Sequence, residues 1–153
     1  MSIHFDIERW ISLKERYNQW WNGKLKGLLH VTVGGNAPDR PEPELPSHSF
    51  HSFYDFSVPA SAVIDRLDYD LSRLRFFGDG FPSAFLNFGP GVMAAFLGAE
   101  LRNGESTVWF HPHEDKPLRE LRFIFNHANP WLRRVSDLTH AAIKHWAGQC
   151  WWG

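Results

Sequence analysis

Apolar residues recur at steps of three and four in two early stretches of the chain, a spacing that predicts amphipathic helices. The first helix begins after Asp6, whose side chain can cap it, and ends at Asn22 and Gly23. Its apolar positions are Ile7, Trp10, Leu13, Tyr17, Trp20 and Trp21. The second helix opens at Ser57 and ends before Gly78. Its stripe consists of Val63, Ile64, Leu67, Leu71 and Leu74.

A further long helix is expected near the end of the sequence. Asn129 can cap it, and Pro130 suits its first position because proline lacks the N–H that would be unpaired there. The helix should stop at Gly148, and the Cys-Trp-Trp stretch at 150–152 then begins like another buried element. Its apolar residues are Trp131, Val135, Leu138, Ala142 and Trp146.

Short β-branched or aromatic runs bounded by turn residues predict strands. Residues 28–33, 81–88 and 121–125 are such runs, and a short apolar helix is expected over residues 91–97. The Asn-Gly pair at 103–104 predicts a hairpin between its flanking segments. Buried strands that alternate with amphipathic helices are typical of an α/β protein.

The stretch from residue 34 to residue 57 is long and has no helical period. It contains four prolines, and loops of this length in compact domains usually serve a function. Its second half is strongly aromatic, with Phe50, Phe53, Tyr54 and Phe56 close together. We therefore expect residues 50–56 to pack onto an apolar surface.

Composition narrows the possible partners. The chain has 153 residues, and its 16 Lys+Arg against 17 Asp+Glu give a net charge of −1, which argues against a polycationic nucleic-acid binder. The longest apolar run, residues 92–97, is far shorter than the roughly 20 residues that span a bilayer, so no membrane partner is expected. A single cysteine, Cys150, cannot close an intramolecular disulfide, and a cytoplasmic location is expected.

Two long segments carry a resemblance to a known family. ERYNQWWNGKLKGLLHVTVGG, residues 15–35, combines a helix end, a glycine-containing turn and a short strand. FPSAFLNFGPGVMAAFLGAELRNGESTVWF, residues 81–110, combines a strand, a short helix ending in Leu-Gly and an acidic hairpin. Together they resemble the opening elements of the uroporphyrinogen decarboxylase superfamily, which also contains cobalamin-dependent methyltransferases.

The resemblance implies a fold and a chemistry. Members of this superfamily are (β/α)8 TIM barrels, which take roughly 250 residues or more. Residues 1–153 would then be a single incomplete domain, the N-terminal portion of the barrel with a helical N-terminal extension and a β-hairpin insertion. A full-length member would bind a small-molecule substrate and could use cobalamin or zinc. No cofactor is expected for this chain, which should be inactive alone and self-associate through unpaired strand edges.

The sequence departs from the decarboxylase pattern at two places. Porphyrinogen-processing members carry two arginines in an Arg-Gln-Ala-Gly-Arg stretch after the first strand, where guanidinium groups pair with substrate carboxylates. The matching residues here are 34–38, Gly-Gly-Asn-Ala-Pro. Those enzymes also place an aspartate after the second strand, whereas this chain offers Asn87. The resemblance therefore favours a methyltransferase-type or uncharacterised member over a true porphyrinogen decarboxylase.

Five residues form the candidate site. Asn87 follows a predicted strand and would lie at the carboxyl end of the barrel, where active sites are built. His48 and His51, in the aromatic loop, could act as acid, base or ligand, although loop hydrogen bonding is the more common role. Gly89 and Gly91 could present N–H groups to an anionic cofactor, although a plain strand-to-helix turn is the far more common explanation of such glycines.

Two other features suggest chemistry less directly. The His-Pro-His-Glu-Asp stretch at 111–115 has metal-ligating residue types, but a solvated turn is the simpler interpretation and no metal site is predicted. Cys150 lacks a neighbouring base, which favours a buried thiol over a nucleophile.

A different class of function is also compatible with the sequence. The chain could be a self-standing α+β binding or interaction module that contacts its partner through the aromatic loop 50–56. Whether the chain has any enzymatic activity is left open by its residues alone.

Overall fold

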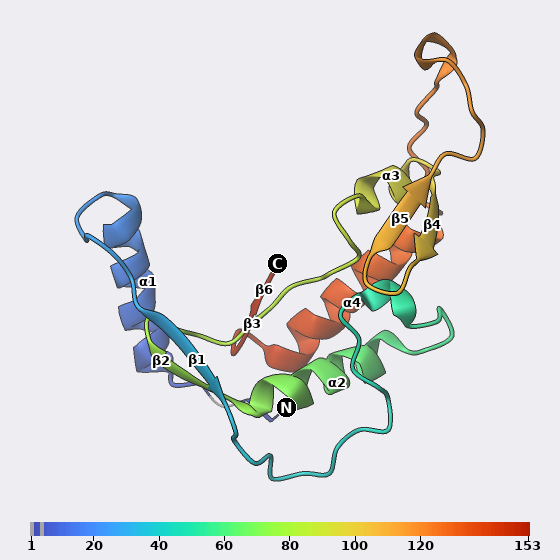
Figure 1. Cartoon of the computed structure of the whole chain (residues 1–153). Coiled ribbons are helices and arrows are strands. Elements are labelled where there is room, and N and C mark those ends of the chain that lie inside the picture. Colours follow the sequence, from blue (N-terminus) through green and yellow to red (C-terminus); the bar gives the residue numbers. More distant parts are fainter. Residues whose placement is uncertain (1, 4) are drawn as a thin grey trace.

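The computed structural model describes residues 2–3 and 5–153 and arranges them as a mixed α/β protein (Figure 1). The described residues form four α-helices, two short 3-10 helices and three separate two-stranded sheets. The expected combination of helices and strands is confirmed, but these sheets do not join into a closed barrel. No helix in the described ranges is long and apolar enough to cross a membrane.

Helix α1, Ile7–Trp21, begins and ends where the sequence predicts. The Asp6 side chain caps it by accepting a hydrogen bond from the Glu8 backbone N–H at 3.0 Å. Gly23 follows the helix with a φ of +69°, a left-handed conformation that glycine adopts without strain.

The first sheet pairs β1, His30–Gly34, with β2, Leu74–Gly78, in antiparallel register. The strand expected at 28–33 is therefore present, but it begins two residues later and ends one residue later. Its expected role as the first strand of a parallel barrel is not met, because β1 pairs with β2 and in the opposite direction. Leu74, expected in the second helix, lies in β2 because that helix already ends at Ser72.

Asp79 fixes the end of this sheet to α1. Its carboxylate accepts a hydrogen bond from the Leu29 N–H at 2.8 Å and forms an ion pair with Arg16. The Tyr17 hydroxyl donates to the Asp79 carbonyl oxygen at 3.2 Å. These bonds satisfy a buried carboxylate and hold the sheet against the helix.

The main hydrophobic core lies between α2, Ala60–Ser72, and α4, Pro130–Trp146, which pack side by side (Figure 1). Asn129 caps α4 as predicted, accepting bonds from the N–H groups of Trp131 and Leu132 at 2.9 and 3.1 Å. The side chains at the centre of this core are Val63, Ile64, Phe88, Leu138, Ala142 and Trp146.

A second sheet joins distant parts of the chain. β3, Ser83–Ala84, pairs in parallel with β6, Trp151–Trp152. β3 is shorter than the strand predicted at 81–88, because only two of those residues meet a partner strand. The expected further element at 150–152 is confirmed as β6.

The connection from β3 to β6 contains a short helix and a hairpin. Helix α3, Val92–Phe96, agrees with the short apolar helix expected there. β4, Glu100–Asn103, and β5, Val108–His111, form the predicted hairpin, closed by a hydrogen bond from the Gly104 N–H to the Thr107 carbonyl at 2.8 Å.

The prediction of a strand at 121–125 is wrong. This segment follows the 3-10 helix η2, Leu118–Glu120, as irregular chain, and Phe123, Ile124 and Phe125 are exposed. A strand needs a hydrogen-bonding neighbour, and no strand among the described residues pairs with this segment.

Candidate functional site at the carboxyl end of β3

The structure brings two of the candidate residues into direct contact. His51 begins the 3-10 helix η1, His51–Phe53, and its backbone N–H donates to the Asn87 carbonyl at 2.7 Å. The Asn87 backbone N–H in turn donates to His51 Nδ1 at 3.0 Å. The aromatic loop is thereby bonded to the chain just beyond β3, although 36 positions separate the two residues.

Both ends of the Asn87 side-chain amide form hydrogen bonds with the backbone. Its Nδ2 donates to the Ser49 carbonyl at 2.7 Å, and its Oδ1 accepts the Gly89 N–H at 3.1 Å. Both ends of the amide therefore fix the two loops together. A catalytic role of Asn87 stays a prediction, and the second Nδ2 proton and second Oδ1 lone pair are the groups left for it.

His51 is buried, with 3% of its surface exposed. Burial, and to a smaller extent the charge of Arg134, lower the pKa of its imidazole, while the backbone bond to Asn87 opposes them. Nδ1 also lies 3.2 Å from the Asn87 carbonyl oxygen, so it can accept the Asn87 N–H with the ring proton on Nε2, or donate to that oxygen with the proton on Nδ1. Nε2 is buried and has no hydrogen-bond partner among the described residues.

His48 packs against aromatic residues of the same loop. Its ring stacks on Phe53 with 5.6 Å between centroids and meets Tyr54 edge to face at 4.8 Å. The Tyr54 hydroxyl donates to the Pro46 carbonyl at 2.9 Å, which anchors this aromatic group. The structure gives His48 a packing environment, and its catalytic role stays a prediction.

The two candidate glycines lie where the β4–β5 hairpin approaches closely. A Cβ on Gly91 would come within 2.5 Å of the Phe110 ring, and one on Gly89 within 3.0 Å of Val108. Gly89 also has a φ of +83°, which favours glycine. Close packing therefore accounts for both residues. Their role in binding a cofactor stays a prediction, and α3 is only five residues long.

The site includes one charged residue that the sequence analysis missed. Arg134 lies in α4 and is 6% exposed, on the same face as Trp131 and Leu138. Its Nη1 donates to the Val58 carbonyl at 2.7 Å. Its spacing could have revealed it, because Arg134 lies three residues after Trp131 and four before Leu138, both on the apolar face of the predicted helix.

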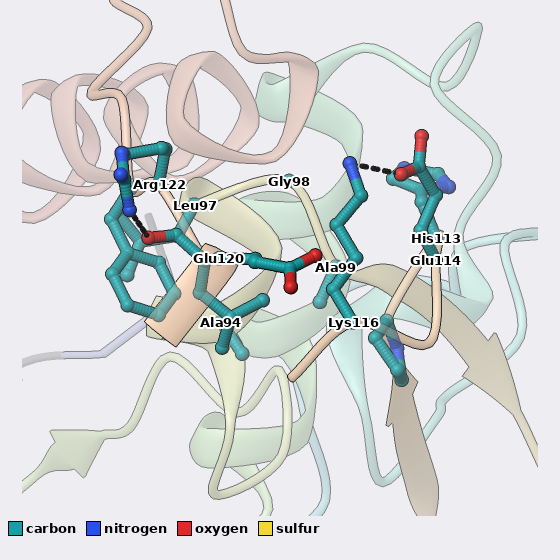
Figure 2. A pocket seen from close by; sticks show the side chains of 12 residues that line it. Ala94, Leu97, Gly98, Ala99, His113, Glu114, Lys116, Glu120 and Arg122 are labelled. Atoms are coloured by element: carbon teal, nitrogen blue, oxygen red, sulfur yellow. Dashed lines mark hydrogen bonds and ion pairs between the residues drawn. The ribbon is translucent and has the colours of Figure 1, made fainter. Parts of the chain in front are cut away.

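A separate cavity of about 440 Å³ lies between α3 and the segment after β5 (Figure 2). Figure 2 shows the Lys116 side chain turned towards Glu114, with which it forms an ion pair. Arg122 Nη1 donates to the Leu121 carbonyl at 3.0 Å. Lys116, Glu114 and Arg122 are thus bonded within the segment after β5. Their arrangement does not point to a particular class of ligand.

The histidines at 111 and 113 do not form part of a metal centre in the described structure. No three His, Cys, Asp or Glu residues of the described ranges are grouped so as to hold a metal ion. His113 lines the cavity beside α3, and Glu114 is engaged by Lys116.

Cys150 is a buried thiol. Burial raises its pKa to about 12, and its Sγ donates to the Trp151 carbonyl at 3.3 Å. The interpretation of this residue as a packed thiol agrees with the structure, since a nucleophile requires a lowered pKa.

Comparison with known proteins adds no relative. No protein family, curated protein or solved structure matches this chain. Only the sequence and geometry of the chain therefore bear on its function.

Proposed function

We propose that this chain forms the N-terminal portion of a (β/α)-barrel protein resembling the uroporphyrinogen decarboxylase superfamily, with a small-molecule site at the carboxyl end of β3. In this proposal the complete protein is a cytoplasmic enzyme of methyltransferase type or an uncharacterised member. The absence of the expected arginines from 34–38 and the presence of Asn87 disfavour porphyrinogen decarboxylation. The chain alone has no catalytic activity.

The observation that carries the proposal is the parallel pairing of β3 with β6. Parallel strands occur almost only in sheets whose two faces are both covered. α4 covers one face, where Trp152 packs on Trp146 with 5.6 Å between centroids. On the neighbouring positions Phe85 and Trp151 are 67% and 52% exposed. One face of this two-stranded parallel sheet is therefore covered, and apolar residues beside it remain exposed. This is the arrangement expected if further strands and helices of an α/β protein pack next to it.

The position of the candidate site fits the same proposal. In barrels and open α/β sheets, ligands bind beyond the carboxyl ends of the parallel strands. Asn87 and the His51 bonded to it lie just there relative to β3, and α4 begins nearby, with the Asn129 side chain bonded to the Ala95 carbonyl at 2.8 Å.

The alternative, a binding module that uses loop 50–56, is less well supported. His51, Ser52 and Tyr54 are buried, and Phe56 is 48% exposed. The loop therefore contributes chiefly to the core instead of presenting a flat aromatic surface.

The association state tests the proposal. We expect the 153-residue chain to form oligomers whose mass, measured by light scattering after size exclusion, rises with concentration, because the strand edges and apolar residues of the β3–β6 unit are uncovered. Replacing Phe85 and Trp151 together by glutamate should lower that mass. Ile11→Glu, which changes an equally exposed residue of α1, should not.

A chain that remains monomeric at every concentration and unfolds cooperatively would contradict the barrel proposal and favour the self-standing module. The genomic DNA downstream of the Gly153 codon provides a second test. Further alternating strand and amphipathic-helix patterns in any reading frame would support the barrel, and their absence would oppose it.

A further inference from the structure

Arg134 has an incomplete set of hydrogen bonds although it is buried. Nη1 donates to the Val58 carbonyl at 2.7 Å. Nε and Nη2 are buried and have no partner among the described residues. Burial of unpaired donors is unfavourable, and in native proteins such groups usually meet a ligand, water or ion.

Neighbouring carboxylates do not fill this gap in the described structure. Asp55 and Asp137 are close enough for their charges to act on Arg134. The Asp55 carboxylate instead accepts the Ser57 N–H at 2.8 Å, and both aspartates are exposed. Burial is the main influence on Arg134 and lowers its pKa, as expected for a guanidinium without a close counter-charge.

The two open donors have a defined shape. Nε and Nη2 lie on one edge of the planar guanidinium, so that their N–H groups point in parallel. This edge matches the two oxygens of a carboxylate, which it can bind through two parallel hydrogen bonds. The bond from Nη1 to Val58 holds the guanidinium plane in a fixed orientation.

His51 supplies a further donor in the same region. Its Nε2 is buried and has no partner among the described residues, and Nε2 carries the ring proton in the tautomer whose Nδ1 accepts the Asn87 N–H. Phe88 links the two groups, since its ring lies 5.9 Å from that of His51 and 6.0 Å from that of Trp131, one turn before Arg134.

A partly exposed ring lies beside the first turn of α4. Phe56 packs on Trp131 with 4.7 Å between centroids and is 48% exposed.

We propose that the Nε and Nη2 edge of Arg134, together with His51 Nε2, binds the carboxylate group of a small-molecule ligand. The guanidinium edge holds both oxygens, and the imidazole N–H donates to one of them. This inference assigns a ligand class to the site at the carboxyl end of β3, but it depends on the buried donors and not on the barrel proposal. If the chain proves monomeric, the barrel proposal fails but this inference about the ligand does not.

The test is an NMR titration of the full chain with acetate at constant ionic strength and pH 7. The Arg134 Nε–H resonance, assigned through Arg134→Lys, should shift saturably with acetate and not with the neutral isostere acetamide. Arg134→Lys keeps the charge but removes the fork, and it should weaken acetate binding about tenfold as followed by backbone amide shifts. Arg133→Lys, at an exposed neighbouring position, should change nothing.

His51→Asn should weaken acetate binding severalfold, because asparagine can still accept the Asn87 N–H at the place of Nδ1 but lacks the Nε2 donor. Absence of a saturable shift in the folded wild-type chain would overturn the proposal and assign the open donors to water. Tighter binding of inorganic phosphate than of acetate would also overturn it, since the class of ligand would then be wrong.

Discussion

At the scale of single residues, the candidate site joins His51 of the aromatic loop to Asn87 beyond β3, and Arg134 of α4 is buried close enough for its charge to act on His51. The sequence identifies Asn87 because it follows a predicted strand, and His51 because histidine can act as acid, base or ligand near neutral pH. Their mutual hydrogen bonds could not be foreseen, because they join segments 36 positions apart. Arg134 has no local motif, and only its place on the apolar face of α4 distinguishes it from Arg133.

The lowered pKa of His51 makes the stability of the protein dependent on pH. The ordinary pKa of histidine is about 6.5, so below that pH the unfolded chain binds a proton that the folded chain excludes. His51 therefore contributes stability above pH 6.5, and this contribution is lost as the pH falls, by up to about 1.4 kcal/mol per pH unit.

We expect the thermal midpoint of the wild-type chain to fall between pH 7.5 and pH 5.5, and to fall less in His51→Asn, which has no titrating group at this position. Circular dichroism at several pH values measures both midpoints. His140→Asn, at an exposed position of α4, should retain the wild-type slope. An identical slope in all three proteins would show that His51 does not titrate in this way.

At the scale of elements, local signals predict the helices well and the strands poorly. Asp6 and Asn129 cap α1 and α4 as expected, because a cap depends only on neighbouring residues. Strands depend on partners elsewhere in the chain. The apolar run at 121–125 has no partner among the described strands. Residues 74–78 pair with β1, and this pairing makes them a strand although the helical pattern extends to Leu74.

The junction after β2 allows no side chain at Gly78. Its φ is +58°, and a Cβ there would come within 2.4 Å of the Leu29 carbonyl oxygen, which is backbone and cannot move easily. Gly23 has a similar φ of +69° but nothing within 4 Å of its Cβ position. Substitution of Gly23 therefore reports the energetic cost of the left-handed backbone alone, and substitution of Gly78 reports that cost together with a steric clash.

We predict that Gly23→Ala lowers the free energy of unfolding by about 1 kcal/mol, the ordinary effect of a left-handed alanine. Gly78→Ala should lower it by about 3 kcal/mol or more, because a steric clash is added. Urea unfolding at pH 7 measures both. Equal losses would mean that the β1–β2 sheet shifts freely away from Leu29.

At the scale of the whole molecule, Asp68 connects three parts of the chain. Its carboxylate is fully buried and accepts bonds from the Trp146 indole N–H at 3.0 Å and the Ser2 backbone N–H at 2.5 Å. Burial raises the pKa of this carboxyl, but the hydrogen bonds and the nearby His145 outweigh burial, and the net pKa is lowered. Asp68 therefore stabilises the fold at neutral pH.

We expect Asp68→Ala to lower the free energy of unfolding by about 3 kcal/mol at pH 7, because it leaves the buried Trp146 N–H unpaired. The difference from wild type should shrink as the pH falls below about 3.9, where the unfolded carboxyl is protonated. Asp65→Ala, which changes a partly exposed partner of Arg40, should cost less than about 1 kcal/mol. A difference that stays constant from pH 7 to pH 2 would contradict the ionised state of Asp68.

The parallel sheet has a consequence for biosynthesis. A ribosome delivers β3 well before β6, since 67 residues lie between Ser83 and its register partner Trp151, and as many between Ala84 and Trp152. During that interval the aromatic stretch around Phe85 has no strand beside it, which makes the nascent polypeptide prone to sticking to its neighbours on a polysome. Chaperone binding to translation intermediates should therefore be greatest after the ribosome has passed Phe85. It should decline once Trp151 and Trp152 have emerged from the exit tunnel.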